Sequence, residues 1–501
     1  MAGRDDPSEI RHARNQSLGR VSVMRKFVVL VGVVLLVMGC SQQQPAKPNI
    51  VFFLIDDLGW QDSGHMGSTY YDTPSIDKLA GQSIRFDHAY SAAANCAPTR
   101  AAIMSGQYAP RTGIYTVRKS DRGESERRRL VPTENTWDLE NGVVTLAESL
   151  KAAGYATAFL GKWHLGDGEE GGPLIQGFDI NIGGNRSGAG SHFAPYENPD
   201  MEEGPDGEYL TDRLTNEALE FIEAQNSDTP FFLYLSHFAV HTPIEAPDAT
   251  IAKYVDRKGD DFHNDPEYGA MVDHVDQGVG RILKLLEDKR FDGNTLIVFT
   301  SDNGGYGPAT QSPGLRGAKG YPWEGGNRVP LLIRLPDKGG AGRVVTEPVN
   351  SIDLYPTLVE QAGRAMPPGQ IADGLSLSPI LKGGDTLERD ALFFHFPAYL
   401  QAYEDAEGWR ATPFGSIRMG RYKLIEFFEF GQLELYDLEQ DSLEARNIVL
   451  ERPEITAKLY ERMQAWREET NAPVPNELNP EYDPQFAPQG YVTWDDVAAK
   501  L

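Results

Sequence analysis

The sequence predicts an α/β protein in which helices sandwich a large, mostly parallel sheet, with a smaller C-terminal domain of antiparallel sheet plus helix. Three observations predict it. The 501 residues exceed one ordinary core, because cores stop growing at roughly 250 to 300 residues. Apolar runs alternate with helical patterns through most of the chain. From about residue 390 the runs become short and closely spaced, and one amphipathic helix follows them.

The large sheet is predicted from continuous apolar runs rich in β-branched and aromatic residues. They lie at 50–55, 156–160, 231–235, 296–300 and 329–335. Such runs suit strands that are buried on both faces, as the strands of parallel sheets are. Helical patterns lie at 144–153, 212–224 and 268–287, and the apolar residues of the last recur at helical spacing. That face is expected to pack in the core.

The C-terminal part shows a different pattern. Short runs at 391–396, 416–419, 422–427 and 433–436 predict a small antiparallel sheet, and residues 453–469 predict an amphipathic helix. We therefore divide the chain into a signal, lipoprotein and linker segment (1–47), a main domain (48–389) and a C-terminal subdomain (390–501).

Composition and charge limit the functions that are possible. The chain is 40% hydrophobic and 24% charged, as soluble globular proteins are. Its formal net charge of −26 argues against nucleic acid as a partner, which needs an array of cations facing the phosphates. A small anion is still possible, because a few converging cations can override a negative surface. Only Cys40 and Cys96 are cysteines, so no disulfide framework supports the fold.

The N-terminus has the layout of a secretory signal. Arg25 and Lys26 precede an apolar run at 27–38, which is too short for a span of about 20 residues. The segment ending at Cys40 resembles the cleavage box of bacterial lipoproteins, so we expect lipidation of Cys40. A plain signal peptide or an N-terminal anchor helix is the alternative, and Met24 is a second candidate start. All three readings place the protein beyond the inner membrane. As a lipoprotein it would lie in the bacterial periplasm or cell envelope, most naturally at the outer membrane, with membrane contact only through the lipid anchor.

Polar groups follow the predicted strands. They are Asp56 and Asp57, Lys162 and His164, His237 and His241, and Asp302 and Asn303. Open α/β sheets bind ligands at the carboxyl ends of their strands, so these groups should converge on one crevice. The oxygen donors suit Ca²⁺ or Mg²⁺ rather than zinc. Taken singly, each pair is as well explained as a helix or turn cap, and the Asn-Gly at 303–304 is also a turn signal.

Cys96 lies in the segment Cys96-Ala97-Pro98-Thr99-Arg100, where Pro98 and Thr99 open a helical stretch at 100–104. A helix N-terminus favours an anion, and Arg100 adds positive charge. An isolated cysteine is more often a buried structural residue.

The motifs around these residues are specific. Residues 96–100, followed by Met-Ser-Gly at 104–106 and Pro-Arg-Thr-Gly at 110–113, resemble the signature of the type I sulfatases, and Gly-Lys-Trp-His-Leu-Gly at 161–166 matches a second signature. These arylsulfatase-like enzymes belong to the alkaline phosphatase superfamily and depend on a formylglycine. The resemblance runs from about residue 48 to the C-terminal helix. It implies an alkaline-phosphatase-like fold with catalysis in 48–389.

The resemblance also implies a role for each matched residue. Cys96 would be oxidised to formylglycine (3-oxoalanine) by a formylglycine-generating enzyme. Asp56, Asp57, Asp302, Asn303 and position 96 would bind Ca²⁺, with Mg²⁺ the weaker candidate; Arg100 and His164 would support the formylglycine hydrate; Lys162 and Lys319 would bind sulfate oxygens; His241 would be the proton donor. An ordinary histidine pKa of about 6.5 would suit that transfer near neutral pH.

These roles predict a sulfuric ester hydrolase acting on an organic sulfate ester, most naturally a sulfated carbohydrate. Two alternatives remain open. One is a phosphate or phosphonate ester hydrolase of the same superfamily, and the other is a non-catalytic surface lipoprotein that binds sulfated glycans. His237 has no motif role and is interpreted as structural or supporting. The basic run at 118–129 is either a solvated loop or a rim that meets additional sulfates, with Arg127, Arg128 and Arg129 as the residues to test.

Overall fold

The structure is a computed structural model that describes residue 1, residues 47–403 and residues 406–501. The signal and lipoprotein predictions, including lipidation of Cys40, concern residues outside those ranges. Residues Lys47–Leu501 form one compact unit. Among the described residues, no helix has both the length and the apolar character that crossing a bilayer requires.

The main sheet has eight strands in the order β5-β4-β6-β1-β7-β8-β2-β9. The strands are β1 (Asn49–Ile55), β2 (Ile84–Phe86), β4 (Ala156–Gly161), β5 (Ile180–Ile182), β6 (Phe231–Ser236), β7 (Thr295–Ser301), β8 (Leu331–Arg334) and β9 (Val344–Val345). Only β8 runs against its neighbours. The mostly parallel sheet and its five predicted strands are confirmed, while the short strands β2, β5 and β9 were not predicted.

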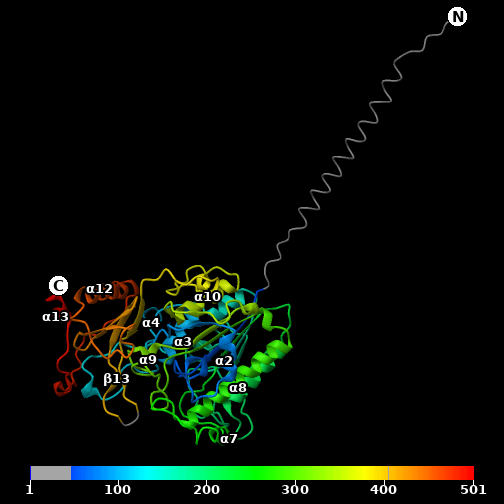
Figure 1. Ribbon diagram of the computed structural model, residues 1–501, viewed down its shortest axis with the longest axis horizontal. Coiled ribbons are helices and arrows are strands. Elements are labelled where there is room, and N and C mark those ends of the chain that lie inside the picture. Colours follow the sequence, from blue (N-terminus) through cyan, green and yellow to red (C-terminus); the bar gives the residue numbers. More distant parts are fainter. Residues whose placement is uncertain (2–46, 404–405) are drawn as a thin grey trace. The chain divides into compact units, whose positions relative to one another are not determined.

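Helices cover both faces of this sheet. Val51 and Phe53 of β1 point into a core formed with α2 (Pro74–Gly81), α6 (Leu210–Glu223) and α8 (Pro266–Asp288). Phe52 and Leu54, one residue out of phase, point into a second core formed with α3 (Cys96–Ser105), α5 (Leu146–Ala152) and α10 (Leu354–Gln361). This alternation explains why the strand sequences are apolar throughout. In Figure 1, α10 and α8 lie on opposite sides of the sheet.

The start of α3 differs from the prediction. The helical stretch was expected at 100–104, but α3 begins at Cys96 and ends at Ser105. The Asn95 side chain accepts a hydrogen bond from the Cys96 N–H, at 3.0 Å, and Gly106 ends the helix in the left-handed conformation. Because Asn95 caps the helix, position 96 occupies its first turn.

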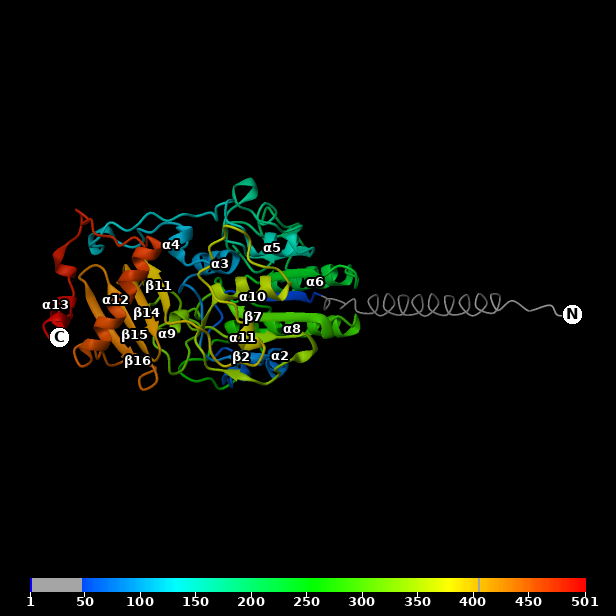
Figure 2. The same ribbon diagram turned by 90° about the horizontal axis from the view of Figure 1, so that it is seen from above.

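The C-terminal sheet is antiparallel, as predicted. Its order is β11 (Leu392–Phe396), β14 (Phe414–Met419), β15 (Tyr422–Phe427) and β16 (Gln432–Asp437), and helix α12 (Pro453–Thr470) packs on it (Figure 2). Two strand pairs join β3 (Ala89–Tyr90) to β10 (Val349–Asn350) and β12 (Leu400–Gln401) to β13 (Trp409–Ala411). The short helices are α4 (Ala109–Thr112), α7 (Asp248–Ile251), α9 (Glu324–Asn327), α11 (Ser378–Leu381) and α13 (Trp494–Ala498).

The sheet places the predicted polar groups at one edge. Strands β1, β4, β6 and β7 are mutually parallel neighbours, so their carboxyl ends lie side by side. Asp56 follows β1, Lys162 follows β4 and Asp302 follows β7. The crevice predicted at the ends of these strands is therefore where the side chains meet.

Candidate active site

Four oxygen-bearing side chains meet at the ends of β1 and β7. They are Asp56, Asp57, Asp302 and Asn303, and all are fully buried. The Asp57 N–H donates to Asp302 Oδ1 at 3.2 Å, and Asn303 Nδ2 donates to Asp57 Oδ1 at 2.7 Å. Asp57 has a left-handed backbone (φ 61°), which turns the chain sharply after β1. These contacts hold Asp57, and with it the adjacent Asp56, against the loop that follows β7.

Each of the three carboxylates has a cationic partner. Lys162 Nζ lies 2.5 Å from Asp56 Oδ2, Lys319 Nζ lies 2.6 Å from Asp57 Oδ2, and the Arg100 guanidinium lies 2.7 Å from Asp302 Oδ2. Arg100 also donates to the Lys162 carbonyl and to Ser236 Oγ, at 2.5 and 2.7 Å. The alternating charges explain how so many ionised groups can be buried together.

These charges shift the carboxyl pKa values. Burial by itself would raise the pKa of Asp56, but Lys162 and His241 outweigh it and lower the value to about 2. Burial likewise opposes ionisation of Asp57, while Lys319 and His241 bring its pKa below the ordinary range. Both residues are therefore carboxylates at neutral pH.

The oxygen atoms of Asp56, Asp57, Asp302 and Asn303 are possible ligands of a bound cation. Asp56 Oδ1 and Asn303 Oδ1 are buried, and neither accepts a hydrogen bond from any described residue, although the Arg100 guanidinium lies 3.6 Å from Asp56 Oδ1. A buried oxygen that accepts no hydrogen bond is costly unless something else satisfies it. Two such oxygens beside two further carboxylates fit a hard divalent cation that prefers oxygen ligands.

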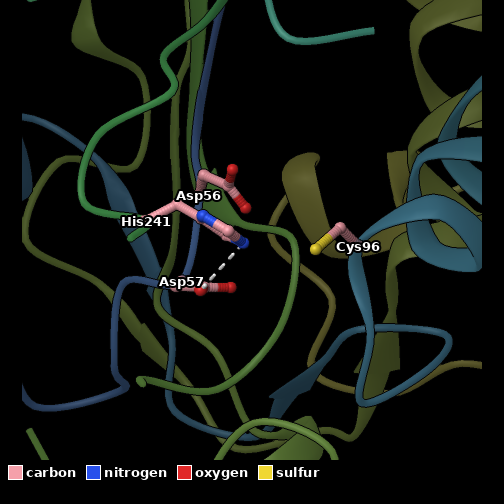
Figure 3. A group of neighbouring side chains, drawn as sticks. All are labelled: Asp56, Asp57, Cys96 and His241. Atoms are coloured by element: carbon pink, nitrogen blue, oxygen red, sulfur yellow. Dashed lines mark ion pairs between the residues drawn. The ribbon is translucent and has the colours of Figure 1, made fainter. Parts of the chain in front are cut away.

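Cys96 faces the same acids from the other side of the crevice. Figure 3 shows its sulfur directed toward Asp56, Asp57 and His241, and one ligand atom from each of the four residues lies within 4.8 Å of the others. Burial raises the pKa of the Cys96 thiol to about 11, although Lys162 and Lys319 oppose the shift. The thiol is therefore neutral near pH 7 and a poor nucleophile in its unmodified form.

His241 lies on the other flank of the acids. Its Nδ1 donates to the Thr242 carbonyl at 2.7 Å, which leaves Nε2 facing Asp57 Oδ2 at 3.8 Å. His192 Nε2 donates to the His241 carbonyl at 2.9 Å. Burial, then the charges of Lys319 and Lys162, lower the pKa of His241 to about 4. The expectation of an ordinary pKa is therefore wrong for this structure, because two ammonium groups face the ring.

His164 and His237 have different surroundings. His164 faces the crevice, its Nδ1 has no hydrogen-bond partner among the described residues, and its backbone is left-handed (φ 67°). Burial and the charges of Lys162 and Arg100 push its pKa well below the ordinary value. His237 is fully buried behind the crevice, outside the residues that line it.

The crevice opens into a cavity of about 1070 Å³. Its charged or ionisable lining residues are Cys96, Arg118, Lys119, Arg122, Lys162, His164, His241, Lys319 and Arg410, together with Tyr306 and Tyr403. Arg118, Lys119 and Arg122 thus belong to the rim, but Arg127, Arg128 and Arg129 do not. Arg127 and Arg129 instead contact Glu407 and Glu429 of the C-terminal part, so the choice of test residues in the basic run was wrong.

Several residues of the site were not predicted from the sequence. Trp137, Tyr403 and Arg410 line the cavity. His192 contacts the backbone carbonyl of His241, and Tyr268 contacts that of Asp57. None of them lies directly after a predicted strand, and that position was the feature that predicted the site residues. Asn95 could have been found, because Asn before a helix is a common N-cap.

The fold and the crevice together define a class: an α/β protein with an alkaline-phosphatase-like fold, and with buried acids and cations at the carboxyl edge of its main sheet. The family model "Sulfatase" matches residues 48–364, and the model "N-sulphoglucosamine sulphohydrolase, C-terminal" matches residues 318–469. Within that class the chain therefore belongs to the sulfatase family and is a sulfuric ester hydrolase.

Relatives cover nearly all of the described chain. A protein named "Sulfatase" from Formosa agariphila is 33% identical over 90% of this chain and 96% of its own length. N-acetylgalactosamine-6-sulfatase of Canis lupus familiaris is 34% identical over 70% of this chain and 69% of its own length. Among solved structures, Ps i-CgsB in complex with k-i-k-neocarrahexaose is 30% identical, with a TM-score of 0.72, over 86% of this chain and 95% of that one.

Proposed function

We propose that this sulfatase removes sulfate from a sulfated carbohydrate with a formylglycine made from Cys96 and a bound Ca²⁺. One observation carries the proposal. Cys96 lines a cavity together with Lys162 and Lys319, and both lysines are anchored by buried carboxylates behind it. The neutral Cys96 thiol needs chemical conversion before it can attack an ester.

Asp56, Asp57, Asp302 and Asn303 would hold the metal, with position 96 as a further ligand. The two unsatisfied oxygens described above support this assignment. A bound Ca²⁺ would supply Lewis acidity toward the sulfate oxygens and the nucleophile. Mg²⁺ is the weaker candidate, because it keeps its waters and demands a more regular geometry.

The chain's own residues divide the remaining work. Oxidation and hydration of position 96 would place two hydroxyls on one carbon, so that one attacks sulfur and loss of the other's proton later releases sulfate. Lys162 and Lys319 would bind the sulfate oxygens, and Arg100 would orient Asp302 and add positive charge. His164, whose Nδ1 is unpartnered, would take the proton of the second hydroxyl.

His241 would protonate the leaving oxygen from Nε2, because its Nδ1 is occupied by the Thr242 carbonyl. Its low pKa follows from burial and from Lys319 and Lys162. A bound sulfate ester brings a negative charge between these lysines, which would raise the pKa of His241 in the complex. We therefore propose that binding of the substrate raises the pKa of His241 and so favours the protonated ring that donates the proton.

The substrate class rests on the cavity and on the relatives' names. The cavity is far larger than a single sulfate group requires, and cations line it well beyond the two lysines. One relative is named for an amino-sugar sulfate, and a 30% identical structure holds a neocarrahexaose. An aryl sulfate or a small sugar sulfate would fit the same catalytic residues.

Mass spectrometry of the tryptic peptide containing position 96, from protein purified out of its native host, tests the proposal first. Conversion of thiol to aldehyde gives a loss of about 18 Da and supplies the activated nucleophile. The same preparation is then assayed for sulfate release from an aryl sulfate and from sulfated oligosaccharides. An unmodified thiol with no turnover would leave the non-catalytic glycan-binding alternative.

A phosphate or phosphonate ester hydrolase is the other alternative. Matched phosphate and sulfate monoesters separate the two, because the proposal expects faster hydrolysis of the sulfate. For the metal, dialysis against a calcium chelator should abolish turnover, and Ca²⁺ should restore it better than Mg²⁺ at equal concentration. Full activity after chelation would contradict the metal assignment.

We also propose that the chain is exported and lipidated at Cys40, on the sequence pattern alone. Cys40→Ala should move the enzyme from the membrane fraction to the soluble periplasmic fraction, with sulfatase activity per molecule unchanged. Recovery of the variant in the membrane fraction would favour an uncleaved anchor helix.

A further inference from the structure

The cavity mouth carries positive charge that the proposed chemistry does not use. Beyond Lys162 and Lys319, four cations line it, namely Arg118, Lys119, Arg122 and Arg410, and no aspartate or glutamate within residues 47–403 or 406–501 belongs to the lining. This occurs on a chain with 73 acidic and 47 basic residues, where a cation normally finds a carboxylate. None of the four lies within 4.0 Å of a carboxylate of any described residue.

Another cation of the same basic segment does have acidic partners. Arg127, a few residues away, pairs with Glu124 and Glu407 at 2.6 and 2.9 Å. Arg118 and Lys119 are exposed and have no such partner. Within this basic segment, Arg127 is therefore neutralised by acidic partners, whereas Arg118 and Lys119, which line the cavity, are not.

The fold brings these cations together from two distant segments. The Tyr399 N–H donates to the Ser120 carbonyl at 2.8 Å, so the loop at 117–122 runs beside β12. Arg410 lies on β13, which pairs with β12, and its Nε donates to the Gln401 carbonyl at 2.8 Å. The Arg122 guanidinium donates to the Val117 carbonyl. Arg122 and Arg410 are thus held in place, not free in solvent.

The cations also repel one another. Burial lowers the pKa of Arg122, and the positive charges of Arg410 and Arg118 lower it further. Arg122 and Arg410 are half-buried and restrained, whereas Arg118 and Lys119 are exposed. An anion between these mutually repulsive cations would stabilise them. Aromatic surface lies beside them: Trp137 is 43% exposed in the same cavity, and the Arg410 guanidinium lies over the Tyr403 ring at 4.2 Å. Sugar rings pack on such aromatic faces.

We propose that Arg118, Lys119, Arg122 and Arg410 form a subsite for a second anionic group of the substrate, so that the enzyme prefers a carbohydrate with another sulfate or a carboxylate beside the sulfate that is cleaved. This rests on the proposed function, because the scissile sulfate must lie at Lys162 and Lys319 for the second anion to reach the mouth. The subsite selects polyanionic oligosaccharides over singly sulfated sugars.

The test compares three disaccharides of one backbone: one with a single sulfate, one with a second sulfate, and one with a uronic carboxylate in its place. The variants are Arg118→Asn with Lys119→Gln, and separately Arg410→Gln. Asn tolerates the left-handed backbone at position 118 (φ 64°). Arg122 is left unchanged because its guanidinium also holds the loop. Arg127→Gln, from the same segment but outside the cavity lining, is the matched control.

Each subsite variant should lower kcat/KM about 10-fold on a doubly anionic disaccharide, mainly through KM, and change it less than about twofold on the singly sulfated one. Arg127→Gln should change neither. The loss should fade at high salt, since these are partly exposed charges. Comparison of the second-sulfate and carboxylate substrates identifies which anion the subsite prefers.

Equal losses on singly and doubly anionic substrates, or no loss on either, would overturn the subsite while the sulfatase assignment stands. If the wild-type enzyme, with an aldehyde at position 96, cleaves an aryl sulfate but none of the disaccharides, the carbohydrate proposal fails, and the subsite fails with it. Thermal unfolding of each variant checks that the fold is intact.

Discussion

At the scale of single residues, the chemistry depends on what position 96 can do that an ordinary side chain cannot. The Cys96 thiol is buried, and its pKa is raised to about 11. The helix N-terminus and two lysines are therefore insufficient to create a thiolate. The surrounding cations suit an anion held in front of position 96 rather than an ionised sulfur.

Cys96→Ser tests the need for two hydroxyls on one carbon. A serine has one hydroxyl, so it can accept the sulfuryl group but cannot expel it. We expect a single turnover that leaves the protein heavier by about 80 Da, a trapped covalent intermediate. Intact-protein mass spectrometry after incubation with an aryl sulfate measures this, with Cys96→Ala as the control that gains no mass. Sustained turnover by the serine variant would refute the scheme.

Tyr268 is a positioning residue for Asp57. Its hydroxyl lies 3.2 Å from the Asp57 carbonyl and 2.5 Å from Asp62 Oδ2, and it is fully buried on α8. Tyr268→Phe removes the hydroxyl that lies between the Asp62 carboxylate and the Asp57 carbonyl, beside a left-handed backbone turn, which should weaken the metal site and cost about 1 to 3 kcal/mol of stability.

The expected result for Tyr268→Phe is a higher Ca²⁺ concentration for half-maximal activity, with rescue by excess Ca²⁺. Tyr70→Phe is the control, because Tyr70 is buried nearby but donates to the Tyr254 carbonyl instead. A stability loss of the same size without any change in the Ca²⁺ titration would mean that Tyr268 is merely structural.

At the scale of elements, the end of β4 sets the position of Lys162. Gly161 has a left-handed backbone (φ 100°) and pairs with Ser236 of β6. A Cβ at Gly161 would lie 1.9 Å from the Ser236 carbonyl oxygen, which also accepts a hydrogen bond from the Lys162 N–H at 2.8 Å. Only glycine therefore allows the strand to end with Lys162 directed at Asp56.

Gly161→Ala should separate the ends of β4 and β6 and displace Lys162, which would lower kcat/KM by about 100-fold. Gly154→Ala is a matched control, because Gly154 has a similar φ of 90° but open space around the added Cβ. Both variants incur about 1 to 2 kcal/mol of left-handed strain, and only Gly161→Ala should lose activity. Equal activities of the two variants would show that Lys162 does not depend on this packing.

At the scale of the whole molecule, a buried ion cluster links the main sheet's loops to the C-terminal sheet. Lys423 of β15 lies 3.2 Å from Glu324 of α9 and 3.0 Å from Glu444, and it is 2% exposed. Removing one member of a buried cluster leaves the others uncompensated, which typically costs about 3 to 5 kcal/mol.

Lys423→Met should therefore lower the free energy of unfolding by about 3 to 5 kcal/mol in urea titrations. Lys284→Met, which breaks an exposed pair with Asp288, should cost less than about 1 kcal/mol. If the two variants were equally stable, the cluster would contribute nothing beyond packing.

Buried histidines predict acid sensitivity of the fold. Burial, then the charge of Arg467, lower the pKa of His395 to about 3, and burial lowers that of His237 to about 4. An unfolded histidine titrates at about 6.5, so below that pH the unfolded state binds more protons than the folded state. The stability that the neutral rings provide is present above pH 6.5 and is lost as the pH falls toward 4 and 3.

His395→Gln keeps a donor for the Pro473 carbonyl, which His395 Nε2 contacts at 2.8 Å, and removes the titrating ring. The slope of unfolding free energy against pH between 6.5 and 4.5 should become shallower by about 1.4 kcal/mol per pH unit. Urea titrations across that range measure the slope. An unchanged slope would mean that His395 is accessible to protons in the folded state.

The pattern of residues along the chain was enough to predict the mostly parallel sheet, its main helices and the polar residues after its strands. Strands buried on both faces must be continuously apolar, and parallel strands must end at one edge, so Asp56, Lys162 and Asp302 could be brought together from pattern alone. The signature around Cys96 identified the family, because its residues are adjacent in the chain.

The folded arrangement alone sets which groups face each other across the crevice. It lowered the pKa of His241, because Lys319 and Lys162 approach the ring from other loops. It separated the rim residues Arg118 and Lys119 from Arg127, and it brought Arg410 beside them from a strand nearly three hundred residues away. Such pairings depend on loop paths and long-range contacts, which leave no periodic signal in the sequence.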